Sequence, residues 1–282
     1  MKILYTIKDL QNTLQPYIEE GKKIGFVPTM GALHEGHISL VEESNKNNDI
    51  TVVSVFVNPT QFNDKNDLLK YPRTLESDCR LLKVHGASIV FAPSGEEMYP
   101  EPDKRQFCYP PLDVVMEGKF RSGHFNGVCQ IVSKLFDAVA PNRAYFGEKD
   151  FQQLAIIREM TAREGYLVEI IGCPIVREAD GLAMSSRNMR LSLSERKNAL
   201  KIFQTLSESR TFAGDHSIKE TLGFVENAIK MVPGLTLEYF SIVDGNTLQE
   251  VASWDESSFI AGCIAVFCGE VRLIDNIKYK ES

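Results

Sequence analysis

Short apolar runs recur along the first part of the chain, and segments with a helical period separate them. The runs lie at residues 24–27, 51–57, 88–92, 143–147 and 167–172. Continuous apolar runs of this length are typical of parallel strands that are buried on both faces. Strands and helices that alternate with right-handed crossovers predict a Rossmann-like, doubly wound α/β sheet. Ligands of such sheets bind beyond the carboxyl ends of the strands.

The clearest helical segment carries a single apolar stripe. Its members follow one another at steps of three and one: Val128, Ile131, Val132, Leu135, Phe136 and Val139. This spacing puts all six side chains on one face of a helix. We interpret the stripe as a core face without a further role.

The pattern changes after about residue 177. Two charged amphipathic helices are predicted, at about 193–209 and 217–231, and strand-like runs follow at 235–243, 259–267 and 271–274. This order is typical of an α+β unit and not of further βαβ repeats. We therefore predict two domains, a Rossmann-like domain over residues 1–176 and a smaller α+β cap over residues 177–282.

Composition and charge narrow the classes of protein. The 282 residues carry a net charge of −7, which argues against a nucleic-acid partner because such proteins normally present a basic surface. No apolar stretch is long enough to cross a bilayer, and the first residues lack the apolar core of a signal peptide. We expect a cytoplasmic protein without membrane contact. The six cysteines show no CxxC pair and no zinc spacing, so we expect no protein-bound metal centre.

Residues 28–40 form the most informative segment. They read PTMGALHEGHISL, which predicts the end of a strand, a loop bracketed by Gly31 and Gly36, and the start of a helix. Backbone N–H groups and the positive end of a helix can meet an anion in such a loop. His34 and His37 can point into it. It is not a P-loop, because Gly36 is followed by His37 and Ile38 in place of Lys and Ser or Thr. An ordinary loop with two histidines is the alternative.

Polar side chains also follow two other predicted strands. Asn58 and Gln61 come after the strand at 51–57, and their amides suit a polar or carboxylate substrate. The strand at 143–147 is followed by Glu148, Lys149, Asp150 and Gln153. A lysine there can offset charge that builds on a phosphate oxygen. Each group taken alone has a plain alternative, a turn or a solvated helix cap.

Two further segments suit phosphate binding. Met184-Ser185-Ser186-Arg187 offers two hydroxyls and a guanidinium, which can clamp a phosphate. Residues 117–127 read EGKFRSGHFNG, and their glycines and basic residues predict a mobile flap or, equally, an exposed loop.

The HxxH spacing resembles that of the HIGH-type nucleotidylyl transferases, and MSSR resembles the loop that closes over ATP in those enzymes. The blocks PTMGALHEGH, FVNPTQF, YPRT, GKFRSGHFNGV, AYFGEKDFQQ and READGLAMSSRN, which cover roughly residues 24–192, resemble the pantothenate synthetase (pantoate–β-alanine ligase) family more closely. The resemblance implies an ATP-dependent condensation of (R)-pantoate with β-alanine through a pantoyl adenylate. It releases AMP and pyrophosphate. It also implies Mg²⁺ on the polyphosphate and a homodimer.

The resemblance also implies the site residues. The catalytic residues would be His37, His34, Lys149 and Arg187, and the substrate-binding residues Gln61, Gln153 and Asn58. Residues that hold ATP would be Met30, Gly31, Ala32, Leu33, His34, Glu35, Gly36, His37, Gly147, Glu148, Lys149, Asp150, Val176, Met184, Ser185, Ser186 and Arg187.

Two rival hypotheses remain at this point. Another HIGH-type enzyme, such as a nucleotidylyl transferase, would release pyrophosphate without any dependence on β-alanine. A non-catalytic ATP-sensing module would bind ATP without forming AMP. Three separate blocks suited to phosphate chemistry favour an enzyme.

Overall fold

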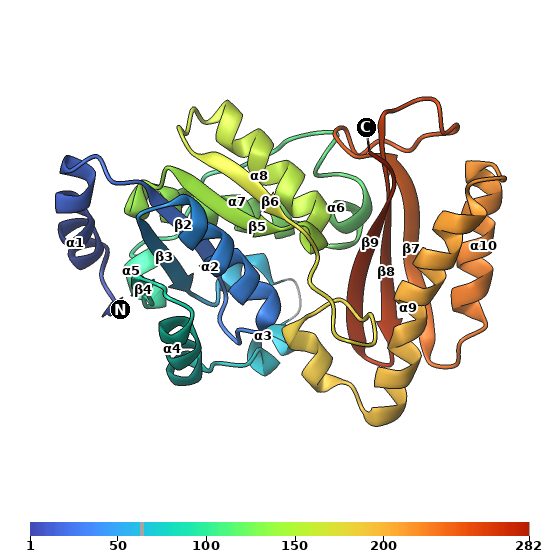
Figure 1. The fold of residues 1–282 in the computed structure, drawn as a ribbon, viewed down its shortest axis with the longest axis horizontal. Helices are drawn as coiled ribbons and strands as arrows, with labels where there is room; N and C mark the ends of the chain where they lie inside the picture. The colour runs from blue at the N-terminus through green and yellow to red at the C-terminus, as the bar shows by residue number, and fades with distance from the viewer. Residues whose placement is uncertain (63–64, 282) are drawn as a thin grey trace. The chain divides into compact units, whose positions relative to one another are not determined.

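The computed structural model describes residues 1–62 and 65–281, which form two compact units. The first unit comprises residues 1–109, 121–148 and 156–174. The second comprises residues 110–120, 149–155 and 175–282, of which 282 lies outside the described residues. Neither unit is therefore continuous in sequence, because two short segments, 110–120 and 149–155, pack with the C-terminal part of the chain. Figure 1 shows the elements of each unit.

The first unit contains a six-stranded parallel sheet with the strand order β1-β4-β3-β2-β5-β6. The doubly wound α/β class predicted from the apolar runs is thus confirmed. The strands are β1 Lys2–Leu4, β2 Ile24–Thr29, β3 Ile50–Val55, β4 Ile89–Phe91, β5 Arg143–Gly147 and β6 Glu169–Cys173. The helices and helical turns are α1 Ile7–Glu19, α2 Glu35–Asn47, η1 Pro59–Gln61, α3 Lys65–Lys70, α4 Leu75–Val84, α5 Gly95–Met98 and α7 His124–Val139. Two elements run from one unit into the other, η2 Glu148–Asp150 and α8 Phe151–Arg163.

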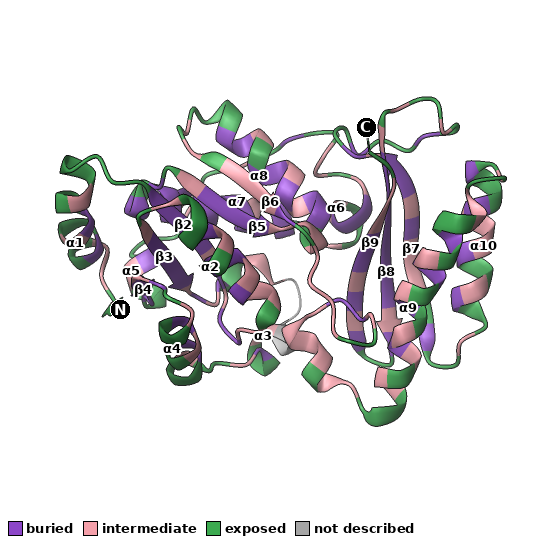
Figure 2. Cartoon of the chain, viewed as in Figure 1, coloured by how far each residue is buried: buried purple, intermediate pink, exposed green. Residues whose placement is uncertain are grey.

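Helix α7 presents a buried apolar face in the first unit. All six members of the predicted stripe are at most 5% exposed, and the ring of Phe136 meets that of Phe26 edge to face. Figure 2 shows α7 and the central strands as largely buried. The stripe is the core face that its spacing predicts.

Helix α2 lies against β2 at a contact that only glycine permits. A Cβ atom at Gly25 would lie 2.1 Å from the hydroxyl of Ser44 and 2.4 Å from the amide nitrogen of Asn48. Ser44 hydrogen-bonds the hydroxyl of Thr51 at 2.8 Å. The missing side chain therefore lets α2 pack closely over the strands whose carboxyl ends precede the candidate site.

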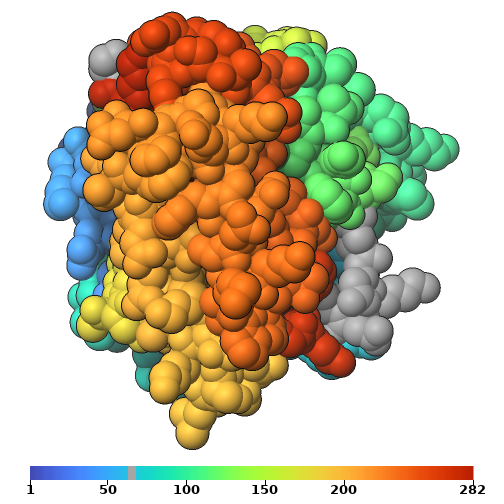
Figure 3. Space-filling view, turned by 90° about the vertical axis from the view of Figure 1, so that its right-hand side faces the viewer, coloured from blue at the N-terminus to red at the C-terminus, as the bar shows by residue number. Residues whose placement is uncertain are grey.

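The second unit has an α+β architecture. Strands β7 Leu235–Asp244, β8 Phe259–Cys268 and β9 Val271–Glu281 form an antiparallel sheet, and α6 Met116–Phe120, η3 Ser186–Arg190, α9 Leu193–Phe212 and α10 Ile218–Lys230 complete the unit. Atoms of α9 and α10 fill much of the face seen in Figure 3. Both helices begin with a capping box, Ser192 with Glu195 and Ser217 with Glu220.

One element of this unit is much longer than predicted. The apolar pattern predicts a strand at 271–274, whereas β9 continues to Glu281. Asp275 and Asn276 interrupt the apolar run, yet both are only 4% exposed. Their polar groups are bonded inside the protein, so the strand continues through them. Hydrophobicity alone cannot show this.

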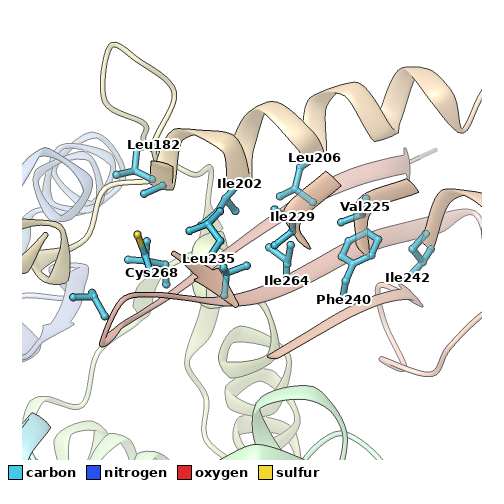
Figure 4. Close-up of a cluster of buried hydrophobic side chains, with 14 of the residues drawn as sticks. Leu182, Ile202, Leu206, Val225, Ile229, Leu235, Phe240, Ile242, Ile264 and Cys268 are labelled. Carbon is cyan, nitrogen blue, oxygen red and sulfur yellow. The ribbon is translucent and has the colours of Figure 1, made fainter. Parts of the chain in front are cut away.

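The core of the second unit lies between its two long helices and its sheet. Leu206, Ile229 and Ile264 are each fully buried in it, and Figure 4 shows their side chains packed together. Burial of a branched side chain of this size stabilises a fold by about 1.5–3 kcal/mol.

We expect Leu206→Ala to lower the free energy of unfolding by about 2–5 kcal/mol, because it removes transfer energy and leaves a cavity. Urea unfolding followed by circular dichroism measures the loss. Leu193→Ala is the matched control, since Leu193 lies on the same helix and is 94% exposed. A loss as large for Leu193 as for Leu206 would contradict this assignment of the core.

Candidate active site

The Met30–His37 segment connects the end of β2 to the start of α2. The hydroxyl of Thr29 donates to the carbonyl of Ser54 at 2.6 Å and accepts from the N–H of Gly31 at 3.2 Å. Gly31 and Ala32 both have left-handed backbone angles, with φ of 80° and 50°. Two such residues in succession turn the chain sharply, and the second is strained because alanine carries a Cβ.

The two histidines meet at the start of α2. Their ring centroids are 4.1 Å apart, and His34 is the N-cap residue. The backbone N–H of His34 donates to Nδ1 of His37 at 3.3 Å. Nδ1 of His37 is therefore an acceptor, which places the ring proton on Nε2. His37 can thus act as a neutral hydrogen-bond donor.

A buried carboxylate that the sequence interpretation did not select supports this loop. Asp78, on α4, is 3% exposed and accepts the N–H groups of Ala32 and Leu33 at 3.0 and 2.9 Å. The predicted contact of loop N–H groups with an anion needs correction here, because these two N–H groups already bind Asp78. Burial raises the pKa of the neighbouring Cys79 thiol, and the charge of Asp78 raises it further.

Gln61 lies beside the same loop, and Asn58 holds it there. The amide nitrogen of Gln61 contacts the sulfur of Met30 at 2.9 Å, and its amide oxygen accepts from Asn58 at 3.2 Å. Asn58 is 1% exposed and also bonds Thr60, Tyr99 and the carbonyl of Gly127. This geometry favours a positioning role for Asn58 over the direct substrate contact that the sequence predicts.

The first turn of α7 packs against η1. A Cβ at Gly127 would lie 2.4 Å from the carbonyl oxygen of Thr60, so α7 and η1 approach through a missing side chain. Nδ1 of His124 donates to the carbonyl of Gln61 at 2.8 Å, while its Nε2 accepts from Arg121 at 3.0 Å. A glycine in an apolar stripe and a histidine one turn earlier are the only signals in the sequence for this contact.

The segment that follows β5 belongs partly to the first unit and partly to the second. Gly147 ends β5, and Glu148 begins the η2 turn. The second unit starts at Lys149, which is half-buried and accepts a hydrogen bond from the Asn276 side chain at its carbonyl, at 3.2 Å. Asp150 is exposed and directly precedes α8.

Two adjacent glutamines of α8 have different surroundings. Gln152 is 4% exposed; it accepts from the N–H of Glu117 and donates to the carbonyls of Leu112 and Val115. Its amide is therefore committed to the 110–120 segment. Gln153 is half-buried and takes no part in these bonds, so its amide is the better candidate for a ligand.

A short hairpin in the second unit brings Val176 and Met184 together. The N–H of Met184 donates to the carbonyl of Val176 at 3.1 Å. Ser185 then caps η3, because its hydroxyl accepts from the N–H of Arg187 at 3.3 Å. Ser186 and Arg187 form the first residues of that turn. Three predicted ATP-binding positions are thus ordered by one turn.

Buried charges fix this hairpin to the sheet. The two terminal guanidinium nitrogens of Arg177 donate to the carboxylate of Asp275, at 2.7 and 2.9 Å. The guanidinium also lies 3.8 Å from the ring centre of Phe203. Arg196 binds Glu178 and Asp180 at the tip, and its hydrogen bond lowers the pKa of Asp180.

Residues 117–127, predicted to be either a mobile flap or an exposed loop, lie mostly in helices α6 and α7. Glu117 is 7% exposed and accepts from Arg272 at 2.7 and 2.9 Å and from Tyr239 at 2.8 Å. Burial disfavours the charge of Arg272, but its bonds to Glu117 and Glu238 outweigh burial and raise its pKa. Lys119 remains exposed, whereas Glu117 and His124 lie in the interiors of their own units.

The described residues contain no group of three His, Cys, Asp or Glu side chains arranged to hold a metal ion. The same residues include no helix long and apolar enough to cross a membrane. Cys108 is exposed, and the other five cysteines are buried.

Comparison with known proteins decides the family. The family model described as Pantoate-beta-alanine ligase matches residues 2–278. The chain belongs to this family. It is 71% identical over 282 residues to the pantothenate synthetase of Bacteroides fragilis and 70% identical over 281 residues to that of Bacteroides thetaiotaomicron, with 100% of each chain covered.

Solved structures of the family agree with the fold. Pantothenate synthetase from Thermus thermophilus is 43% identical, with a TM-score of 0.93 over 99% of this chain and 100% of that one. Pantoate-beta-alanine ligase from Francisella tularensis is 34% identical, with a TM-score of 0.84 over 99% of this chain and 98% of that one. That protein was solved in complex with beta-gamma ATP and beta-alanine.

For this member of the ligase family we expect Gly127→Ala to cost about 1–3 kcal/mol of stability, because the added methyl group forces α7 away from η1. The displacement of η1 moves Gln61, so the ligase rate should fall together with stability. Unfolding curves and a steady-state assay measure both effects. Gly223→Ala is the control, because a Cβ there meets no atom within 4 Å. Equal behaviour of the two variants would contradict the packing argument.

Proposed function

We propose that this chain condenses (R)-pantoate with β-alanine at the expense of ATP, giving pantothenate, AMP and pyrophosphate. The match of the family model over residues 2–278 carries the proposal. The related Francisella tularensis enzyme, whose structure was solved with an ATP ligand and beta-alanine, supports both substrates.

The reaction proceeds in two steps. A carboxylate oxygen of pantoate attacks the α-phosphorus of ATP, an O–P bond forms, and pyrophosphate leaves. The amine of β-alanine then attacks the acyl carbon of the adenylate, an amide bond forms, and AMP leaves. The attacking carboxylate is already ionised near neutral pH, because its ordinary pKa is about 4. The first step therefore needs charge stabilisation and no general base.

We assign that stabilisation to His34, His37 and Lys149. The bond from the N–H of His34 to Nδ1 of His37 supports the assignment, since it makes Nε2 the donor nitrogen of the His37 ring. Arg187 provides a fixed positive charge for the polyphosphate. Gln61 and Gln153 bind pantoate through their amides, and Asn58 positions Gln61.

The nucleotide contacts come from three segments. They comprise residues 30–37, residues 147–150, and Val176 with residues 184–187. Mg²⁺ neutralises charge on the polyphosphate when bound. Substrate oxygens and water would supply most of its ligands.

The proposal extends to organisation. Residues 1–176 supply most of the ATP- and pantoate-binding domain and residues 177–282 most of the cap, while the segments 110–120 and 149–155 belong with the cap unit. The enzyme acts in the cytoplasm as a homodimer. No nucleic acid or membrane takes part. The sedimentation coefficient of the purified protein tests the dimer.

The first experiment measures AMP and pyrophosphate from ATP, Mg²⁺ and (R)-pantoate, with and without β-alanine. We expect multiple-turnover AMP release to require both acids, because the amine is needed to release AMP from the adenylate. Multiple-turnover pyrophosphate release that ignores β-alanine would favour the alternative, another HIGH-type nucleotidylyl transferase. ATP binding without either product would contradict the enzymatic function.

We expect His37→Ala and Lys149→Ala each to slow adenylate formation by about 10²–10³, the loss typical of one donor to a developing oxyanion. Single-turnover pyrophosphate release measures this step directly. His85→Ala and Lys230→Ala are matched controls, because His85 pairs with Glu42 and Lys230 is exposed at the end of α10. Adenylate formation at the wild-type rate in the first two variants would refute the assignment.

A further inference from the structure

The carboxylate of Asp78 is buried, and its hydrogen bonds in the described part of the chain hold the Met30–His37 loop and the start of α4. Oδ2 accepts the N–H of Ala32 at 3.0 Å and the hydroxyl of Thr74 at 3.1 Å, while Oδ1 accepts the N–H of Leu33 at 2.9 Å. Buried charge of this kind is tolerated only when hydrogen bonds replace water. The two peptide N–H groups lie in the loop, 45 and 46 residues earlier in the sequence.

These bonds act at the strained point of the loop. Ala32 has a left-handed backbone conformation with φ of 50°, and residues other than glycine rarely adopt this conformation. A Cβ at the preceding Gly31 would lie 3.0 Å from Oδ2 of Asp78, so the carboxylate also occupies the space beneath the turn. The carboxylate thus stabilises a backbone conformation that the local sequence disfavours.

The position of the histidines follows from this turn. Leu33 directly precedes His34, whose N–H sets the tautomer of His37 and whose carbonyl accepts the N–H of His37 at 2.8 Å. A shift of the Ala32–Leu33 peptide groups would move His34 and break this arrangement.

We propose that Asp78 is a positioning residue for the ATP-dependent step, and this inference rests on the proposed function. Asp78 holds the left-handed turn at Gly31 and Ala32, and it thereby places His34 and His37 at the start of α2. It also keeps two loop N–H groups away from the nucleotide. The loop therefore meets phosphate through its histidines and the first turn of α2, and not through the Ala32 and Leu33 amides.

Asp78→Asn tests the proposal. The amide has one acceptor oxygen and an NH₂ group that faces a backbone N–H, so one loop N–H loses its partner. We expect about 10- to 100-fold weaker binding of a non-hydrolysable ATP analogue in calorimetry, the range expected for an unsatisfied buried donor. Pantoate-dependent pyrophosphate release should slow by a similar factor.

A second substitution separates positioning from general damage. Ala32→Gly removes the strain of the left-handed turn, so in the Asp78→Asn background it should restore a large part of the lost affinity. Ser44→Ala removes another buried hydrogen bond of the same unit, towards the far end of α2, and should leave analogue binding unchanged. Thr74→Val frees the carboxylate from one bond and should weaken binding by a few-fold; it serves as the test should Asp78→Asn fail to fold.

The outcomes are distinct. The inference is overturned if Asp78→Asn binds the analogue with wild-type affinity. If Asp78→Asn does not fold, wild-type affinity in Thr74→Val overturns it instead. A loss of affinity that Ala32→Gly cannot restore also overturns it. If the wild-type protein binds the analogue but releases no pyrophosphate in response to pantoate, only the proposed function is contradicted. Loss and rescue of analogue binding would then still support the role of Asp78.

Discussion

The parallel register between β2 and β3 is the constraint on which the first unit's candidate site depends. The two strands pair from Ile24 with Ile50 to Thr29 with Val55 without a shift. Both therefore end at the same level of the sheet, and the segments that follow them leave it side by side. The hydroxyl of Thr29, bonded to Ser54, fixes this level at its last rung. Met30 and Gln61, which are 31 residues apart in sequence, touch as a direct result.

Buried polar groups convert this edge into a defined geometry. Asp78 in the first unit, and Asp275 and Glu117 in the second, are each nearly inaccessible and each bind groups distant in sequence. A buried ion pair adds little net stability, because desolvation offsets most of the attraction. Removal of one partner is costly, however, since the other charge is left buried. Such pairs select one arrangement of the chain more than they stabilise it, which suits segments that must hold catalytic groups in place.

The sequence predicts what depends on local patterns. Continuous apolar runs reveal five strands of the parallel sheet, and the stripe on α7 reveals its buried face. The apolar pattern does not predict β1, because this edge strand has only three residues and two of them are exposed. The second half of β9 escaped because Asp275 and Asn276 look like solvent-exposed residues until their distant partners are known.

The same limit applies to the site. The histidines and Lys149 stand out because their chemistry suits phosphate and their spacing is local. Asp78 does not stand out, since an acidic residue on a short helix is usually solvated, and its two backbone partners lie 45 and 46 positions away. Hydrogen-bonding partners also separate Gln152 from Gln153, which composition cannot do.

An acidic chain that binds a polyphosphate and two carboxylates must avoid presenting unpaired negative charge to them. The net charge of −7 makes this a real constraint. Three buried carboxylates meet this constraint in two ways. Asp275 and Glu117 pair with Arg177 and Arg272, and Asp78 accepts hydrogen bonds from two peptide N–H groups. The second solution has a consequence for the proposed mechanism. It occupies two backbone donors of the loop, so phosphate recognition as we propose it falls to side chains that Asp78 positions.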